Sequence, residues 1–248
     1  MVICIKKLIK YNLPGMHILY PPGCLVCGTV LYADEQGVCK KCSGRLPYII
    51  GTRCIICSKQ TENGSIRCRD CMNRDHEYER GYALWSYNRV TEKIIADIKY
   101  NRRLAGMPYI VDELVYRCAG LFRLWEIEAL VPVPLHKRKL RQRGFNQAAL
   151  LGESLADRMK IAYMDDVLYR VRYTRPQKNL DDRARKNNLR NAFLADEGRF
   201  ASYGITGNIV LIDDIYTSGS TIDECVGALK EVFSGKIYFV CLCIGDGY

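Results

Sequence analysis

The sequence predicts an α/β protein in which a small cysteine-rich module precedes a mostly parallel sheet covered by helices. Four C-x-x-C pairs lie before residue 72, and apolar segments with strand and helix periods alternate from residue 82 onwards. A length of 248 residues suits one small module and one domain with a sizeable core. We therefore expect an N-terminal segment at residues 1–20, the cysteine module at 21–78 and the α/β domain at 79–248.

The cysteine spacing predicts a double zinc ribbon. Each C-x-x-C turn presents two thiolates to one tetrahedral ion, and two such turns complete a Cys₄ site. Eleven residues separate the first two turns, and ten separate the last two. Because four thiolates leave no coordination position for water, both zinc ions would be structural. The predicted ligands are Cys24, Cys27, Cys39, Cys42, Cys54, Cys57, Cys68 and Cys71.

Two alternatives concern these cysteines. Sequential pairing of the turns is the simplest arrangement, but a crossed pairing has the same spacing. A disulfide framework would replace zinc in a secreted protein, yet no secretory signal is evident. Four other cysteines fall in apolar helix or strand patterns typical of reduced core residues, namely Cys118, Cys225, Cys241 and Cys243. Reduced cysteines favour zinc and a cytoplasmic location.

Apolar periodicity predicts the order of elements in the α/β domain. Strand patterns occur at residues 82–87, 129–134, 167–173, 209–212 and 236–245. Helical patterns occur at residues 90–100, 108–125, 146–159 and 182–191, and in a segment that starts near residues 218–220. Strands that alternate with helices predict a mostly parallel sheet.

The N-terminal segment and the overall charge restrict the function classes. Residues 1–20 carry Lys6, Lys7 and Lys10 among apolar residues, which is typical of a short amphipathic helix. These lysines and Pro14 interrupt the apolar stretches, so we expect neither a targeting segment nor a membrane span. The formal net charge is +10, from 37 Lys and Arg against 27 Asp and Glu, and it favours phosphate-bearing ligands.

The stretch at residues 209–221 carries the most chemistry. An apolar run typical of a buried parallel strand leads into Asp213 and Asp214, and a loop of small residues then opens a helix. Two carboxylates at a strand end can accept hydrogen bonds from the vicinal hydroxyls of a ribose or face a hydrated Mg²⁺. Backbone N–H groups at the helix start favour a phosphate, and Gly219 lets the backbone approach it. Hydroxyls are offered by Thr217, Ser218, Ser220 and Thr221.

A second stretch follows the strand at residues 129–134. Five of the seven residues at 137–143 are basic, and arginine offers a planar fork that matches phosphate oxygens. Because this loop also follows a parallel strand, we expect it at the same edge of the sheet as Asp213. The alternative is an ordinary solvated basic loop.

The stretch with the two aspartates resembles the signature of type I phosphoribosyltransferases, which bind phosphoribosyl pyrophosphate (PRPP). The resemblance implies that Asp213 and Asp214 hold the ribose hydroxyls and that residues 217–221 hold the 5′-phosphate. It also implies that the basic loop holds the pyrophosphate with Mg²⁺. Contacts to pyrophosphate are expected from Arg143, Gly144, Asn146 and Gln147, and then from Arg138 and Arg141.

The whole chain from residue 20 to 245 resembles the ComF family, cytoplasmic proteins of bacterial DNA uptake and their relatives. The shared pieces are the four C-x-x-C turns, VPVP at 131–134, RGFNQ at 143–147 and DDIYTSGST at 213–221. Weaker pieces are IKY at 98–100 and a polar stretch at 174–193, which corresponds to a mobile loop over bound PRPP. The resemblance implies a type I phosphoribosyltransferase-like domain. Its catalytic residues would be Asp213, Asp214 and Arg143, and it leaves the acceptor open.

The alternative is a non-catalytic scaffold that guides single-stranded DNA during uptake. Its basic surface would bind the backbone, and tyrosines around the zinc ribbons would stack on bases. The candidates are Tyr20, Tyr32, Tyr48 and Tyr78. By resemblance, a competence helicase and a DNA-processing protein would be the protein partners.

Overall fold

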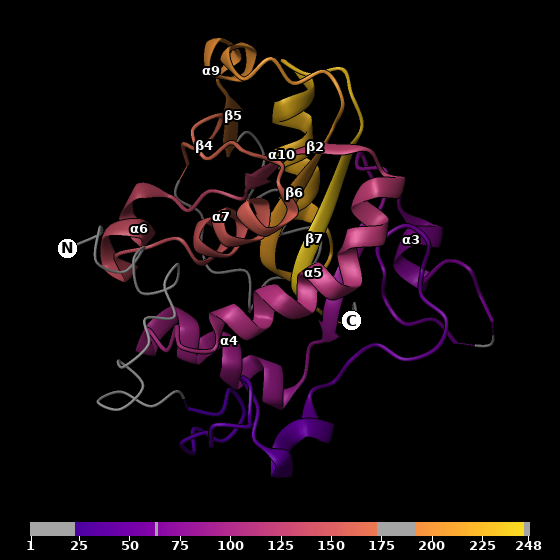
Figure 1. Cartoon of the computed structure of the whole chain (residues 1–248). Helices are drawn as coiled ribbons and strands as arrows, with labels where there is room; N and C mark the ends of the chain where they lie inside the picture. Colours follow the sequence, from indigo (N-terminus) through magenta and orange to yellow (C-terminus); the bar gives the residue numbers. More distant parts are fainter. Residues whose placement is uncertain (1–22, 63, 173–191, 246–248) are drawn as a thin grey trace.

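Five parallel strands form the central sheet of the protein. The computed structural model describes residues 23–62, 64–172 and 192–245 (Figure 1). The strands are ordered β1-β7-β6-β2-β3, and every neighbouring pair is parallel. Their bounds are β1 Gly81–Ser86, β2 Ile127–Pro132, β3 Ala162–Tyr163, β6 Asn208–Tyr216 and β7 Ile237–Ile244. The predicted mostly parallel α/β fold is confirmed.

Helices cover both faces of this sheet. They are α4 Arg89–Asn101, α5 Met107–Leu124, α7 Gln147–Met159 and α10 Ser220–Lys230. In Figure 1, α5 and α7 lie in front of the strands and α10 lies behind them. Local sequence sets where these helices begin: Asn88 and Thr91 form a capping box at α4, and Pro108 occupies the first turn of α5.

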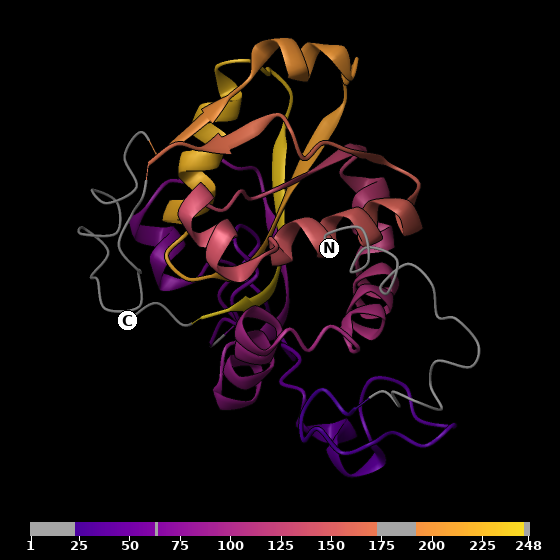
Figure 2. The same ribbon diagram turned by 90° about the vertical axis from the view of Figure 1, so that its left-hand side faces the viewer.

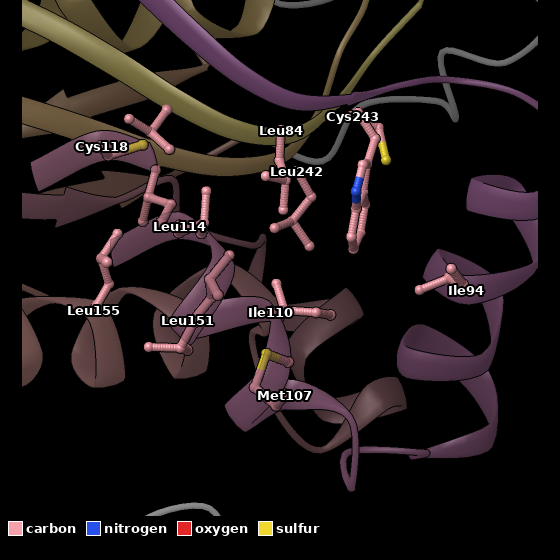
Figure 3. Close-up of a cluster of buried hydrophobic side chains, with 14 of the residues drawn as sticks. Leu84, Ile94, Met107, Ile110, Leu114, Cys118, Leu151, Leu155, Leu242 and Cys243 are labelled. Carbon is pink, nitrogen blue, oxygen red and sulfur yellow. The ribbon is translucent and has the colours of Figure 1, made fainter. Parts of the chain in front are cut away.

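Side chains that alternate along each strand build two hydrophobic clusters, one on each face. In β6, Val210 and Ile212 face α4, α5 and α7, whereas Ile209 and Leu211 face α10. Figure 3 shows the first cluster, where Leu84 and Leu242 from the sheet meet Ile110 of α5. This alternation explains why β6 and β7 read as unbroken apolar runs.

The sheet has a topological switch point between β2 and β6. From β2 the chain passes through α7 to β3 at one edge, and from β6 it passes through α10 to β7 on the opposite side. The carboxyl ends of β2 and β6 are direct neighbours, with Pro132 paired to Ile212. In open α/β sheets a ligand crevice forms at this place.

The structure corrects several predicted elements. The basic stretch expected as a loop is a helix, α6 (Lys137–Arg143), because His136 caps its start and Gly144 ends it at φ 83°. The strand at Asp213 does not stop there, since β6 continues to Tyr216. The strand expected at residues 167–173 is shorter, β4 Leu168–Arg170, and pairs antiparallel with β5 Phe193–Ala195 outside the main sheet. Helix α9 (Glu197–Ser202) was not predicted.

The two zinc ribbons pack on opposite faces of the sheet. The first contains the 3₁₀ helix η1 (Lys40–Arg45), and its Val26 and Leu31 belong to the cluster with α4 and α5. The second contains α3 (Arg69–Asn73), and its Ile49 belongs to the cluster with α10. Figures 1 and 2 show the two ribbons well apart, the first in indigo and the second in purple around α3. Each ribbon thus completes a core of the α/β domain.

Some predictions fall outside the described residues. These concern the amphipathic segment at 1–20, the helix at 182–191 and most of the polar stretch at 174–193. Within the described part of the chain, no helix is both long and apolar enough to cross a membrane.

Candidate functional site

The eight predicted zinc ligands gather in two groups of four. Cys24, Cys27, Cys39 and Cys42 form one group, Cys54, Cys57, Cys68 and Cys71 form the other, and the sulfur atoms within each group lie within 4.8 Å of one another. The pairing is therefore sequential and not crossed. Each group offers four cysteines, the donor set of a structural zinc site.

Local backbone geometry shapes the cysteine turns. The amide of Gly28 donates to the Cys24 carbonyl at 2.8 Å, and the amide of Ser58 donates to the Cys54 carbonyl at 2.9 Å. The amide of Cys39 also donates to Cys24 Sγ at 3.4 Å, which would stabilise a thiolate there. All these cysteines except Cys27 are buried. The residues therefore fit two zinc ions that support structure.

Asp213 and Asp214 lie in β6 at the switch point. The Asp214 carboxylate forms an ion pair with Lys99 of α4, and side-chain exposures of 10% and 14% show that the pair is buried. Burial alone would raise the pKa of Asp214, but Lys99 holds it below the ordinary value. Burial and the neighbouring Asp214 raise the pKa of Asp213 well above its ordinary value. The two carboxylates therefore differ in proton affinity.

Four described basic side chains lie close enough to this acidic pair for their charges to interact with it. Lys99 comes from α4, Lys139 and Arg143 from the inner side of α6, and Arg170 from β4. Burial lowers the pKa of Lys139, and the charges of Arg170, Arg143 and Lys99 lower it further. Arg170 lies close enough to Asp213 for their charges to interact. Among the described residues, this site has four basic side chains against two carboxyl groups, a composition suited to a polyanion.

Helix α6 divides the basic stretch into two faces. Arg143 stacks on Tyr100 at 5.4 Å from the ring centroid and donates to Gln147 Oε1 at 3.3 Å. Lys139 and Arg143 are half-buried beside the acidic pair, whereas Lys137, Arg138 and Arg141 are exposed. The structure therefore brings Arg143 to the site and leaves Arg138 and Arg141 at the surface.

The next predicted contacts have defined structural roles. Asn146 caps α7 through its Oδ1, which accepts from the Ala148 amide at 3.1 Å, and its Nδ2 donates to the Val133 carbonyl at 3.0 Å. Gln147 is buried and lines a small cavity together with Lys99 and Asp214. Gly144 has a positive φ and lies against Arg102, whose Nη2 would be 2.9 Å from an added Cβ. These residues fix α6 and α7 at the carboxyl end of β2.

Residues 217–221, which we call the phosphate loop, comprise the connection after β6 and the first two residues of α10. Gly219 has φ 81° directly before the first helical residue, Ser220. A Cβ at Gly219 would lie 2.5 Å from the Tyr216 hydroxyl, so only glycine fits without displacement. The Ser218 and Ser220 hydroxyls are buried and bonded to each other at 3.0 Å. Both hydroxyls were expected to contact a phosphate, but they are buried and bonded to each other. The backbone N–H groups at the start of α10 are the donors that suit a phosphate here.

Sequence reasoning missed three residues of the site as contacts. Lys99 lies in IKY at 98–100, one of the pieces shared with the ComF family, but no function was predicted for this lysine. In the sequence Lys139 cannot be distinguished from the other basic residues at 137–143. Only the orientation of α6 shows that its side chain is half-buried. Arg170 gave no signal, because the place of β4 depends on its pairing with β5 and on the packing of Leu168 in the cluster with α10, which join segments distant in the chain.

A cavity of about 760 Å³ adjoins the other side of α6 and was not predicted. It lies between α6, α7 and β4, and Arg170 also lines it. Its size suits a small organic ligand.

Two of the tyrosines proposed to stack on bases are unavailable for that role. Tyr78 is buried and its hydroxyl is bonded to that of Tyr216 at 2.6 Å. Tyr48 is half-buried and donates to Glu113 at 2.7 Å. Tyr32 is 76% exposed, and Tyr20 lies outside the described residues.

The fold and the cysteine groups define a class of protein in which a double zinc ribbon is joined to a parallel α/β domain. Residues 15–72 match the family described as double zinc ribbon domain. The chain is 28% identical to the "DNA utilization protein YhgH" of Salmonella typhimurium, over 91% of this chain and 99% of the relative. It is 27% identical to "Competence protein F" of Haemophilus influenzae, over 84% and 91%, and to "Competence protein ComFC" of Bacillus subtilis, over 88% and 91%. The chain is thus a homologue of the ComF-type competence and DNA utilization proteins.

Proposed function

We propose that this protein binds a phosphorylated ribose, PRPP or ribose 5-phosphate, at the carboxyl edge of the sheet and serves DNA uptake or utilization. One observation carries the proposal: Asp213 and the buried Asp214 lie near four described cations, and the phosphate loop follows the same strand. A sugar needs acceptors for its hydroxyls, and its phosphates need cations and N–H donors. The site offers all of these at one edge of the sheet.

The proposed pose assigns each part of the ligand to its own group. The 5′-phosphate would lie against the N–H groups at the start of α10, where the helix dipole favours an anion. The ribose hydroxyls would donate to Asp213 and Asp214. A pyrophosphate would face Lys139 and Arg143, of which Arg143 is oriented by Tyr100 and Gln147. The three parts of PRPP would thus meet three different kinds of donor or acceptor.

The proposal includes Mg²⁺ with PRPP. Asp213 and Asp214 are the residues of this site that could face the hydrated ion, since Mg²⁺ prefers carboxylate oxygen and water. The ion would neutralise charge on the pyrophosphate oxygens. Lys99 already neutralises part of the Asp214 charge, so Asp213 is the carboxylate more available to the ion.

Phosphoribosyl transfer is the reaction that this arrangement would support. The bond between the anomeric carbon and the pyrophosphate oxygen would break, and its electron pair would leave with the pyrophosphate. Arg143 and Lys139 would stabilise this leaving group, and the carboxylates would stabilise the positive charge that develops on the ribose. An acceptor with a free electron pair would form the new bond.

The experiment is calorimetric titration of the zinc-loaded protein with PRPP and Mg²⁺, with ribose 5-phosphate as comparison. Micromolar affinity, about −8 kcal/mol, is expected. Asp213→Asn with Asp214→Asn should abolish binding and leave the zinc content unchanged. The matched control is Asp157→Asn, which removes an exposed carboxylate on α7. Loss of both binding and zinc would indicate misfolding, and absence of binding in the wild-type protein would reject the proposal.

A second candidate is the non-catalytic scaffold that binds single-stranded DNA. It is favoured by the exposed Lys137, Arg138 and Arg141 on the outer face of α6 and by the similarity to relatives named DNA utilization proteins. This binding should weaken steeply as salt rises, in proportion to the phosphates neutralised. A helicase or DNA-processing partner and a cytoplasmic location remain predictions.

A further inference from the structure

Residues 74–78, which connect the second zinc ribbon to β1, run behind the phosphate loop. Arg74 Nη1 donates to the Ser218 carbonyl at 3.1 Å and to Ser220 Oγ at 3.3 Å, and Nη2 pairs with Asp223 of α10 at 2.8 Å. One guanidinium thus contacts the loop and the first turn of the helix that follows. Because these contacts occupy both terminal nitrogens, Arg74 is suited to holding the loop and not to contacting a ligand itself.

The contact with the Ser218 carbonyl sets the direction of a neighbouring N–H group. In a planar trans peptide the carbonyl and the N–H point in opposite directions. Arg74 holds the carbonyl of the peptide between Ser218 and Gly219 toward the ribbon. The N–H of Gly219 must therefore point away from the ribbon, to the side on which the proposed phosphate lies. An N–H fixed before binding costs less ordering free energy when the ligand arrives.

The rings of His76 and Tyr78, from the same connection, pack behind the phosphate loop. His76 Nδ1 lies 3.1 Å from both carboxylate oxygens of Asp223, and its ring stacks on Tyr78 with centroids 4.7 Å apart. His76 Cε1 would lie 3.0 Å from a Cβ at Gly219, so the loop backbone rests directly on this ring. Tyr78 in turn bonds to Tyr216 at 2.6 Å.

The second cysteine group anchors this connection. Cys68 and Cys71 flank the start of α3, and Arg74 is the residue directly after that helix ends. On the same helix, Asp70 forms an ion pair with the buried Lys59. The place of Arg74 is therefore set by the fold of the second ribbon.

We propose that Arg74 and His76 are positioning residues, through which the second zinc ribbon holds the phosphate loop with the Gly219 N–H directed at the ligand phosphate. This inference rests on the proposed function and assigns the ribbon a role in ligand affinity. It also predicts that ligand groups held elsewhere, such as pyrophosphate at Lys139 and Arg143, do not depend on Arg74.

The test compares Arg74→Ala, Arg74→Lys and wild-type protein by calorimetric titration with ribose 5-phosphate and with inorganic pyrophosphate. Arg74→Ala should weaken ribose 5-phosphate binding about tenfold or more, because a charge-assisted bond that fixes the peptide is lost. Pyrophosphate affinity should stay unchanged. Arg74→Lys should recover part of the affinity, since an ammonium can contact either the Ser218 carbonyl or Asp223 but lacks the planar fork. The matched control is Arg69→Ala, an exposed arginine on α3.

A second readout is the amide resonance of Gly219. Ribose 5-phosphate should shift it in the wild-type protein and leave it unshifted in Arg74→Ala. Zinc content and the thermal midpoint show whether each variant is folded, and Asp223→Asn provides the same test if Arg74→Ala unfolds.

The outcomes separate this inference from the proposed function. If the wild-type protein does not bind ribose 5-phosphate, the proposed function fails and the inference falls with it. If the wild-type protein binds and Arg74→Ala binds equally well, only the inference is overturned. An equal loss of pyrophosphate affinity in Arg74→Ala would also overturn it, because a general loss of structure would then explain both effects.

Discussion

Replacing Lys99 by methionine tests whether the ammonium group of this residue on α4 stabilises the buried carboxylate of Asp214. Met keeps the unbranched apolar stem of the lysine, so the change removes the ammonium and leaves little cavity. Asp214 would then be a buried carboxylate without its closest cation. Removing one partner of a buried ion pair costs about 3–5 kcal/mol of unfolding free energy. Because Arg143 still acts on Asp214, we expect the lower end, about 3 kcal/mol.

The stability loss in Lys99→Met should depend on pH. The pKa of Asp214 is held below its ordinary value of 3.8, so the ion pair stabilises the protein above that pH and the contribution is lost as pH falls through the lowered value. In Lys99→Met, burial would raise the pKa of Asp214 because the opposing effect of Lys99 is lost, and acid would neutralise the unpaired charge. The stability difference between wild-type and variant should therefore be largest at neutral pH and shrink on acidification.

Urea unfolding at neutral and acidic pH measures this difference. The double variant Lys99→Met with Asp214→Asn should recover much of the loss, since neither charge remains. The matched control is Lys93→Met on the same helix, whose 51% exposed side chain pairs with Asp97 and should contribute about 0.5 kcal/mol or less. A loss for Lys99→Met that matches the control, or one that does not vary with pH, would refute the reasoning.

Three further predictions concern the other parts of the molecule. Metal analysis should find about two zinc ions per chain. Replacing the fully buried ligand Cys57 by serine should lower this number. Fewer than one zinc ion in the wild-type protein would reject the double zinc ribbon. Gly219→Ala should cost about 2 kcal/mol in thermal unfolding, because the residue has φ 81° and its Cβ would meet Tyr216; an unchanged midpoint would contradict this. Ligand binding that ionises Asp213 should release protons, because burial and Asp214 raise the pKa of this carboxyl in the free protein. The affinity should strengthen as pH rises through the raised pKa, and calorimetry in buffers of different ionisation enthalpy would measure the release.

The two zinc ribbons and the α/β domain share contacts and apolar clusters. A boundary near residue 78 suggests a zinc module joined to a separate domain. Instead, each ribbon contributes apolar side chains to one of the two clusters that cover the sheet. Loss of one zinc ion should therefore weaken the adjacent face of the α/β domain as well as the ribbon itself.

The sequence by itself determined the features that are local in the chain. The cysteine turns depend on residues within a few positions, and the structure brings these cysteines together as their spacing predicts. The acidic pair and residues 217–221 are equally local, so the sequence alone is enough to propose them as a site. The apolar runs of β6 and β7 predicted a buried parallel sheet because both faces of these strands are covered. Sequence resemblance identified the same pieces as those of the ComF family.

The tertiary structure decided the features that depend on distant segments. The sequential pairing of the cysteine turns, the ion pair between Lys99 and Asp214, and the approach of Arg170 to Asp213 join residues far apart in the chain. The phase of α6 selected Lys139 and Arg143 for the site, because a helix turns neighbouring residues to different faces. Spacing cannot specify such contacts, since they arise only when the strands and helices pack around one core.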